Sequence, residues 1–251
     1  MCRWLAYSGS PILLRVALYE GPGVFHSTEP AWNDSNLREL ADHISSPLFF
    51  TQIRAAIGSA VQQTNCHPFR HDNWLFMHNG YINEFAVIKR DLILAVDPSL
   101  YPQDKGQADT EALFFLALTF GLEDDPPAAV EQAIGFVEAV AGRHRVVNPF
   151  QGTIATTDGE SIWAFRYSSE RNSRSLFYTT DVPTLRKLYP ERQLFEEVSE
   201  NARLIVSEPL GDVAGVWNEV PEATCGVVGP DHAELRPFGP RAPATTVPVV
   251  A

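Results

Sequence analysis

The feature that most constrains the fold of this chain is a change of residue pattern near position 150. Before it, apolar residues recur at helical spacing, most clearly in two consecutive segments at 112–122 and 126–140. After it, short runs of strand-forming residues follow one another. The first two, 150–156 and 161–167, are separated by a turn-forming Asp-Gly pair. Helices followed by a run of strands are typical of an α+β fold with antiparallel sheets.

The remaining elements follow from the same rules. We expect strands at 2–7, 48–57, 74–77, 176–180, 204–210, 217–221 and 225–228, and helices at 35–45 and 84–95. The apolar stretch from Pro11 to Tyr19 predicts a further short helix, because proline is favoured in a first turn. No repeat or linker interrupts this order, so we expect one domain, 1–239, and a loosely ordered tail, 240–251.

Charge and cysteine content narrow the class of protein. Lys and Arg number 19 against 31 Asp and Glu, a formal net charge of 19 − 31 = −12. This acidity argues against binding to nucleic acid or to an anionic membrane surface. Three cysteines suggest no disulfide framework, and there is neither a signal-peptide apolar region nor an apolar run of ~18 residues. We therefore expect a cytoplasmic protein without a membrane span.

Cys2 is the first candidate for chemistry. If Met1 is removed, Cys2 becomes the N-terminal residue and carries both a thiol and a free α-amine. An α-amine titrates near ~8, well below the ~10.4 of lysine, so it can be a neutral base at physiological pH. On position alone, the alternative is an ordinary cysteine buried in the first strand.

One arginine, Arg54, interrupts the apolar strand expected at 48–57. A charge inside an apolar strand is costly unless it is paired. Arg54 is therefore either an edge or surface residue of the sheet, or a group that binds a carboxylate through two parallel hydrogen bonds.

The most polar part of the chain, residues 62–71, is followed by His78. Cys66, His67, His71 and His78 together suggest a metal site, but their spacing fits no common zinc pattern and no metal is predicted.

Two further positions have a local and a functional interpretation. Asn79-Gly80 after a strand predicts a turn. The alternative is an oxyanion site, where the Asn79 amide and the Gly80 N–H point at one developing negative charge. Asp109 precedes the apolar helix at 112–122 and is its expected N-cap.

Five short motifs, in order, resemble those of the class-II glutamine amidotransferase domain. They are Met1-Cys2-Arg3, the strand arginine Arg54, His67-Pro68-Phe69, His78-Asn79-Gly80 and Asp109-Thr110-Glu111. The start Met1 to Gly9 and the motif Ser207-Glu208-Pro209-Leu210 are similar to the stand-alone branch, which has no fused synthetase domain. That branch includes γ-glutamyl amide hydrolases of the ergothioneine and glutathione-degradation type. The resemblance extends over residues 1–229.

The resemblance implies an N-terminal-nucleophile hydrolase fold, a four-layer αββα sandwich with two antiparallel sheets, and no cofactor. Cys2 would attack a γ-carboxamide carbon and form a thioester, while Asn79 and Gly80 would hold the oxyanion. Arg54 would bind the α-carboxylate of a glutamine or γ-glutamyl substrate, and Asp109 its α-ammonium.

The resemblance implies supporting roles for four other residues. His67 and His78 would support the loops of the site, and Cys66 and Cys225 would be structural. Three activities stay open: ammonia release from glutamine for an accepting partner protein, hydrolysis of γ-glutamyl peptides or amides without a partner, and binding without catalysis.

The sequence departs from the family pattern in three places. In better-known relatives a tryptophan follows the arginine, and a threonine and a histidine come soon after, whereas here Arg54 is followed by Ala-Ala-Ile-Gly-Ser, so the departing group could be larger than ammonia. Ala108 replaces the serine that usually precedes the aspartate. Relatives carry a longer segment with a core strand where Glu20 meets Gly21, so we expect that the sequence lacks a segment there.

Overall fold

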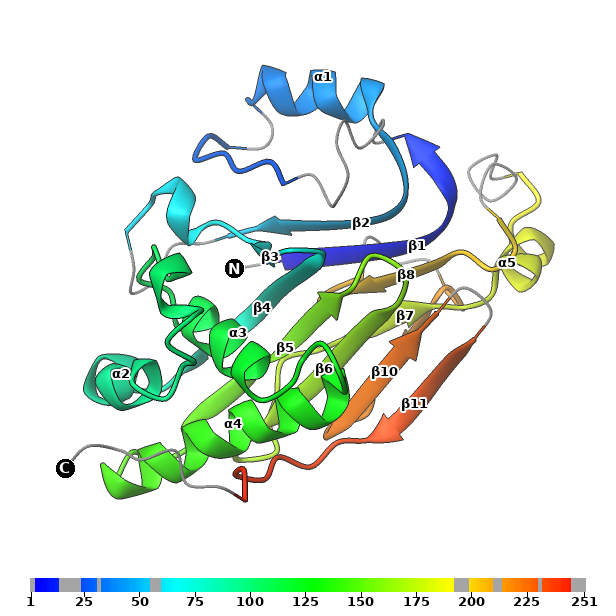
Figure 1. Cartoon of the computed structure of the whole chain (residues 1–251). Coiled ribbons are helices and arrows are strands. Elements are labelled where there is room, and N and C mark those ends of the chain that lie inside the picture. Colours follow the sequence, from blue (N-terminus) through cyan, green and yellow to red (C-terminus); the bar gives the residue numbers. More distant parts are fainter. Residues whose placement is uncertain are drawn as a thin grey trace.

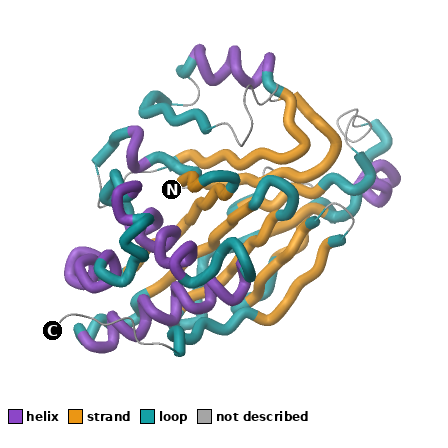
Figure 2. Tube along the Cα trace, viewed as in Figure 1, coloured by secondary structure: helices purple, strands orange, loops and turns teal. Residues whose placement is uncertain are grey.

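Two antiparallel sheets lie face to face, and helices cover their outer faces (Figures 1 and 2). The computed structural model describes residues 3–13, 24–30, 33–54, 60–191, 199–209, 214–229 and 232–244. The predictions for Cys2 and for the junction of Glu20 with Gly21 concern residues outside this part. The expected α+β architecture with two antiparallel sheets is confirmed.

The first sheet has five strands and is built around the start of the chain. Its strands are, in spatial order, β2 (Ser45–Ile53), β1 (Arg3–Leu13), β8 (Arg203–Val206), β7 (Phe177–Thr179) and β9 (Trp217–Glu219). β1 pairs with β2 on one edge, with Arg3 opposite Ile53, and with β8 on the other, with Leu5 opposite Val206. The strand next to Cys2 is therefore held on both edges.

The second sheet has six strands and contains the middle of the chain. In spatial order they are β11 (Ala233–Pro237), β10 (Thr224–Val228), β6 (Ile162–Ser168), β5 (Phe150–Thr157), β4 (Trp74–Ile82) and β3 (Phe69–His71). β5 and β6 form the expected hairpin, and Gly159 in its turn has φ +99°. This is a backbone conformation that favours glycine.

The helices of the described part are α1 (Ser35–His43), α2 (Phe85–Ile93), α3 (Asp109–Thr119), α4 (Pro126–Arg143) and α5 (Val182–Leu188), with 3₁₀ turns at Gln63–Asn65 and Tyr101–Gln103. The side chains of Asp34, Asp125 and Asp181 cap α1, α4 and α5 by accepting a backbone N–H of the first turn.

Alternation along β1 separates two small cores. Trp4 and Ala6 face the second sheet and pack with Met77 in a cluster between the sheets. Tyr7 points the other way and packs with Val182 of α5. Because side chains alternate between the two faces of a strand, one strand can contribute to both layers.

The largest core lies between the six-stranded sheet and the helices α2, α3 and α4. Phe76 of β4 stacks on Phe114 of α3, with ring centroids 5.2 Å apart. α3 is buried over most of its surface, which explains why its sequence is apolar without a polar stripe.

The turn predicted at Asn79-Gly80 is wrong. β4 runs from Trp74 to Ile82 without interruption, and Gly80 lies opposite Gly152 of β5 in the ladder. Pairing with β5 along the whole strand outweighs the local turn preference of Asn-Gly.

Three other expectations also need correction. The N-cap of α3 is Ala108, and Asp109 is the first residue of the helix. Arg54 follows β2 instead of interrupting it. The helix predicted from Pro11 begins as strand, since β1 continues to Leu13. The β1–β2 register shifts between Ser8 and Ile12, an irregularity that accommodates Pro11.

The expected tail is described only in its first part. Arg241 donates its backbone N–H to the Glu131 carbonyl of α4 and forms an ion pair with the Glu131 carboxylate at 3.2 Å. Residues 245–251 lie outside the described part, so the domain boundary at 239 stays a prediction. In the described residues, no helix combines the length and apolar character needed to cross a bilayer.

The contact of α4 with residues 239–242 predicts opposite effects of alanine at two glycines of this helix. A Cβ at Gly135 would lie 2.1 Å from the Arg241 carbonyl carbon, whereas a Cβ at Gly142 would have no neighbour within 4 Å. Both variants gain up to ~1 kcal/mol of helix propensity. Overpacking adds a cost only at Gly135, so urea unfolding should rank Gly135→Ala below Gly142→Ala by about 1–3 kcal/mol. Equal stabilities would show that residues 239–242 do not lie against α4.

Candidate functional site

The pairing of β1 with β2 ends next to two predicted site residues. Arg3 lies opposite Ile53. Cys2 is the covalent neighbour of Arg3, and Arg54 is the covalent neighbour of Ile53. Cys2 itself lies outside the described residues.

Arg54 borders a cavity of about 480 Å³ between residues 24–30, α1, β2 and residues 61–68. Its wall includes Phe25, His26, Glu29, Gln52 and His67. Apolar and polar groups are therefore mixed around Arg54, as is usual in binding sites for small molecules.

A hydrogen bond joins this cavity wall to the strand of the predicted oxyanion pair. The side-chain amide of Gln52 donates to the His78 carbonyl at 3.1 Å. Gln52 is two residues before Arg54, and His78 directly precedes Asn79. The bond crosses from the first sheet to the second, so the segments that carry Arg54, Asn79 and Gly80 lie next to each other.

Asn79 and Gly80 occupy a tight part of the β4–β5 ladder. Asn79 is buried and lies opposite Thr153. A Cβ at Gly80 would lie 2.0 Å from the Gln151 carbonyl oxygen. Only glycine fits at position 80, because any side chain there would collide with the backbone of β5.

His78 lies in a closed niche formed by the same ladder. Its ring stacks on Phe150, and a Cβ at Gly152 would lie 2.2 Å from its Nε2. Nδ1 is 3.2 Å from the Thr110 hydroxyl, whereas the buried Nε2 has no hydrogen-bond partner among the described residues. Burial lowers the pKa of His78, and the nearby Asp109 carboxylate opposes this shift.

His67 is also buried and neutral. Burial is the main reason that the pKa of His67 lies well below its ordinary value, and electrostatic repulsion from His78 and Arg54 adds to this shift. Within the described part of the chain, neither of its ring nitrogens has a hydrogen-bond partner. Two buried imidazoles with unpaired nitrogens therefore stand beside the candidate site, and such groups are rare unless a ligand or water completes them.

Asp109 connects the end of β4 to the start of α3. Its Oδ2 accepts the Ile82 backbone N–H and its Oδ1 accepts the Thr110 backbone N–H, both at 2.8 Å. The half-buried carboxylate keeps further lone pairs for another donor. Thr110 donates its backbone N–H to Asp109, and its hydroxyl lies 3.2 Å from His78 Nδ1, while Arg54 and His67 line the same cavity. The two predicted ends of a substrate clamp therefore lie close to this pair of histidines.

The four side chains that suggested a metal site do not gather. Cys66, His67 and His78 share no candidate cation position in the described residues. His71 lies instead in a group with Asp72 and Glu123, and its Nδ1 is hydrogen-bonded to Gln103. Burial raises the pKa of the Cys66 thiol, and that of the buried Cys225 thiol to about 12, which makes both poor nucleophiles at neutral pH.

Sequence reasoning missed the buried carboxyl of Glu111. Its oxygens accept the backbone N–H groups of Lys105 and Gly106 at 3.1 and 2.7 Å. Asn65 accepts from the next residue of the same loop, Gln107, at 2.8 Å. These bonds hold the loop before Asp109 against residues 60–65. The motif Asp109-Thr110-Glu111 contained the signal, but the resemblance gave Glu111 no role.

Glu111 predicts a pH-dependent part of the stability. Burial raises the pKa of Glu111 from 4.5 to about 7. The folded state therefore binds this proton more tightly, so the contribution of Glu111 is largest below about pH 4 and is lost as the pH rises through 7. Between pH 5 and 8 the free energy of unfolding of the parent should fall by ~2–3 kcal/mol relative to that of Glu111→Gln, as measured by urea unfolding.

The exposed Glu160 gives a matched control for this measurement. Glu160→Gln should leave the difference from the parent constant between pH 5 and pH 8. A constant difference for Glu111→Gln as well would contradict the raised pKa.

Comparison with known proteins agrees with the geometry. Residues 15–180 match the sequence pattern of the family described as glutamine amidotransferases class-II. The chain is 30% identical over 223 residues to a yeast protein from Saccharomyces cerevisiae described as probable glutamine amidotransferase DUG3. The match covers 80% of this chain and 62% of that protein, so the chain spans less than two thirds of its relative.

Solved structures show the same fold. A glutamine aminotransferase class-II domain protein from Silicibacter pomeroyi has a TM-score of 0.79 and 32% identity, covering 95% of this chain and 99% of its own. Glutamine phosphoribosylpyrophosphate amidotransferase from Bacillus subtilis has a TM-score of 0.56 and 14% identity, covering 95% and 49%, a likeness of fold. The predicted four-layer fold of N-terminal-nucleophile type is confirmed, and the chain belongs to the class-II glutamine amidotransferase family.

Proposed function

We propose that this chain hydrolyses the γ-carboxamide of glutamine through a thioester on Cys2 and releases ammonia. The observation that supports this most strongly is the junction of the two sheets. There, the β1–β2 register ends beside Cys2 and Arg54, and the Gln52–His78 bond brings the Asn79-Gly80 segment to the same place.

The reaction needs one nucleophile and one base at this junction. The Cys2 sulfur attacks the amide carbon while its thiol proton passes to the Cys2 α-amine. The tetrahedral oxyanion receives hydrogen bonds from the Asn79 amide and the Gly80 N–H. The C–N bond then breaks, ammonia leaves with the proton from the α-ammonium, and water hydrolyses the thioester to glutamate and the free thiol.

The α-amine is the favoured base because the neighbouring histidines are poor candidates. Both His67 and His78 have lowered pKa values through burial, and both sit in closed surroundings. Their proposed role is to fix the local structure around Asn79. An N-terminal amine needs no separate base residue, provided that Met1 has been removed.

A zwitterionic glutamyl head group needs one cation and one anion. Arg54 at the cavity wall would bind the α-carboxylate. Asp109 already accepts two backbone N–H groups, which orient its carboxylate, and its remaining lone pairs would accept the α-ammonium.

A second candidate activity is hydrolysis of γ-glutamyl peptides or amides without an ammonia-accepting partner. The cavity of about 480 Å³ beside Arg54 favours it, because ammonia needs no such volume. The sequence also has Ala55 where better-known relatives have a tryptophan directly after the arginine. The cavity would then receive the departing amine.

The proposed role of Cys2 predicts that activity depends on its thiol. Cys2→Ala should abolish release of ammonia from glutamine and of amine from γ-glutamyl peptides, a loss of roughly 10³-fold or more in kcat. Cys66→Ala, which removes a thiol from the same cavity, is the matched control and should keep activity. If Cys2→Ala matches the parent on both substrates, Cys2 is not the nucleophile and the proposed function fails; if neither protein acts on either substrate, the chain is a binding module.

A cleavable N-terminal extension tests the α-amine separately. A tag fused directly before Cys2 should suppress activity, because an amide nitrogen is not a base, and protease cleavage that exposes Cys2 should restore it. Mass spectrometry of the N-terminus would report the cleavage. Full activity of the uncleaved protein would contradict the proposed base.

The clamp predicts a change in substrate affinity. Arg54→Lys keeps the charge but loses the bidentate geometry, so KM should rise roughly 10–100-fold with a smaller effect on kcat. Asp109→Asn should lower kcat/KM by a similar factor, because the neutral amide attracts an ammonium group less strongly. Asp125→Asn, at the start of α4, removes a helix-terminal carboxylate elsewhere and should leave both constants unchanged.

A further inference from the structure

Trp4, two residues after Cys2, is anchored at three points. Its backbone N–H donates to the Ser207 hydroxyl at 3.0 Å, and its carbonyl accepts the Ser207 N–H at 3.1 Å. Its indole Nε1 donates to the Thr153 hydroxyl at 3.1 Å. Trp4, Ser207 and Thr153 are all buried, so these bonds are shielded from competing water.

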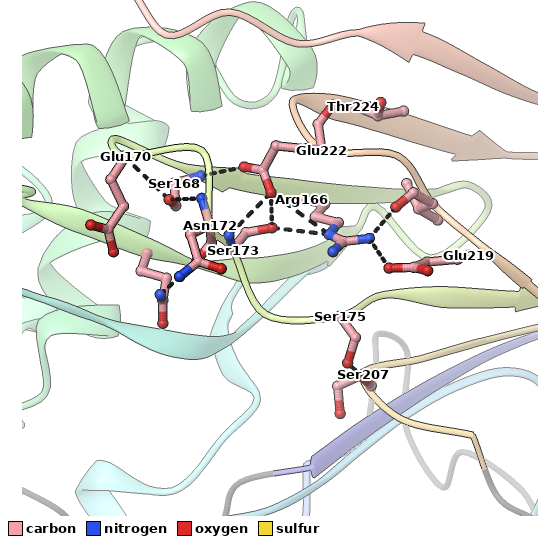
Figure 3. A network of polar contacts seen from close by, with 12 residues as sticks. Arg166, Ser168, Glu170, Asn172, Ser173, Ser175, Ser207, Glu219, Glu222 and Thr224 are labelled. Carbon is pink, nitrogen blue, oxygen red and sulfur yellow. Dashed lines mark hydrogen bonds and ion pairs between the residues drawn. The ribbon is translucent and has the colours of Figure 1, made fainter.

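Ser207 extends the β1–β8 ladder with a side chain in place of a backbone group. The regular pairing places Leu5 opposite Val206, and Trp4 with Ser207 comes next. There the Ser207 carbonyl accepts the Ser175 hydroxyl at 2.9 Å (Figure 3). The Ser207 Oγ, rather than this carbonyl, accepts the Trp4 N–H. Without this hydroxyl, the backbone N–H of Trp4 would be buried without its acceptor.

Thr153 links the same tryptophan to the other sheet. It belongs to β5 and lies opposite Asn79 of β4. The indole–hydroxyl bond therefore sets the position of the start of β1 relative to the strand pair that carries Asn79 and, one residue on, Gly80. Only two peptide units, about 7 Å of extended chain, separate Trp4 from Cys2.

The structure assigns to Ser207 and Thr153 the role of positioning residues: through Trp4, their hydroxyls hold the start of β1 so that the Cys2 thiol meets a substrate carbonyl at Asn79 and Gly80. This inference rests on the proposed function of Cys2. Misplacement of a reacting group by about 1 Å can cost ~10²-fold in rate, so a small loosening of Trp4 would matter.

A neighbouring ion pair is a weaker tether. Arg3 and Glu208 meet at 2.7 Å, but the Arg3 side chain is 62% exposed. An exposed pair of this kind contributes little to stability and is screened by salt. The two buried hydroxyls, rather than this pair, carry the positioning.

The test compares Ser207→Ala and Thr153→Val with the parent in the full chain. Both should lower kcat for glutamine hydrolysis by about 10–100-fold with KM within about twofold, because the clamp at Arg54 and Asp109 is untouched. Thr153→Ser restores the hydroxyl and should recover most of kcat. Trp4→Phe removes the indole donor and, combined with Thr153→Val, should cost no more than either change alone.

Thr156→Val is the matched control. Thr156 is also a buried threonine of β5, but its hydroxyl donates to the Leu75 carbonyl and does not touch β1. It should lose comparable stability and keep kcat. Equal kcat values for Ser207→Ala, Thr153→Val and Thr156→Val, or an effect on KM alone, would overturn the inference.

The rate at which iodoacetamide alkylates the N-terminal Cys2 peptide separates this inference from the proposed function. The two positioning variants should change that rate several-fold relative to Thr156→Val, whether or not glutamine is hydrolysed. If parent hydrolysis is independent of Cys2, the proposed function fails and the alkylation rates alone decide on positioning. If parent hydrolysis depends on Cys2 and the variants match Thr156→Val, only the positioning role fails.

Discussion

Pairing of β1 on both of its edges is the constraint on which the candidate site depends. The first residues of a chain usually fray because nothing holds them. Here β2 lies along one edge and β8 along the other, and the ladder reaches Arg3. A nucleophile at position 2 needs this, since an untethered terminus would spread the thiol over many positions and lose the benefit of fixed geometry.

The opposing surface of the site is fixed by close backbone packing instead. Gly80 and Gly152 face each other across the β4–β5 ladder, and the ring of His78 occupies the space that two Cβ atoms would fill. This arrangement buries the Nε2 of His78 against the backbone of β5 without a well-formed hydrogen bond among the described residues. Local departures from good packing and satisfied polar groups are expected to concentrate at functional sites.

The sequence predicted the layers well and the local geometry of the site less well. The helices α1, α2 and α4 and the hairpin of β5 and β6 have strong periodicity, caps or turn residues, so local signals sufficed. The Asn79-Gly80 turn was wrong because long-range pairing with β5 decides that segment. β3, β11 and α5 were not expected, because they are short and owe their structure to neighbours far away in sequence.

The candidate site residues were predicted by motif order, and the groups that support them were not. Arg54, Asn79 and Asp109 each had an ordinary local interpretation, and only their order along the chain favoured another. No local pattern could show that Thr153 receives the Trp4 indole, or that Glu111 fixes the loop before Asp109, since these bonds join residues that are distant or buried by tertiary packing. Such contacts become visible only with the register of both sheets.

A polar network around Arg166, which lies opposite Thr153 in the β5–β6 ladder, shows what full satisfaction looks like in the same fold. Arg166 donates to the Glu219 carboxylate and to the Val220 carbonyl, and the Glu222 carboxylate accepts from the Ser168 N–H and from Ser173 (Figure 3). This network closes on itself and needs no further ligand.

The buried groups around the cavity differ in this respect. Gln52 Oε1 and both ring nitrogens of His67 lack hydrogen-bond partners among the described residues, and both side chains line the cavity beside Arg54. Buried polar atoms without a partner among the described residues therefore gather beside Arg54, although Arg174 Nε is a further example outside the cavity wall.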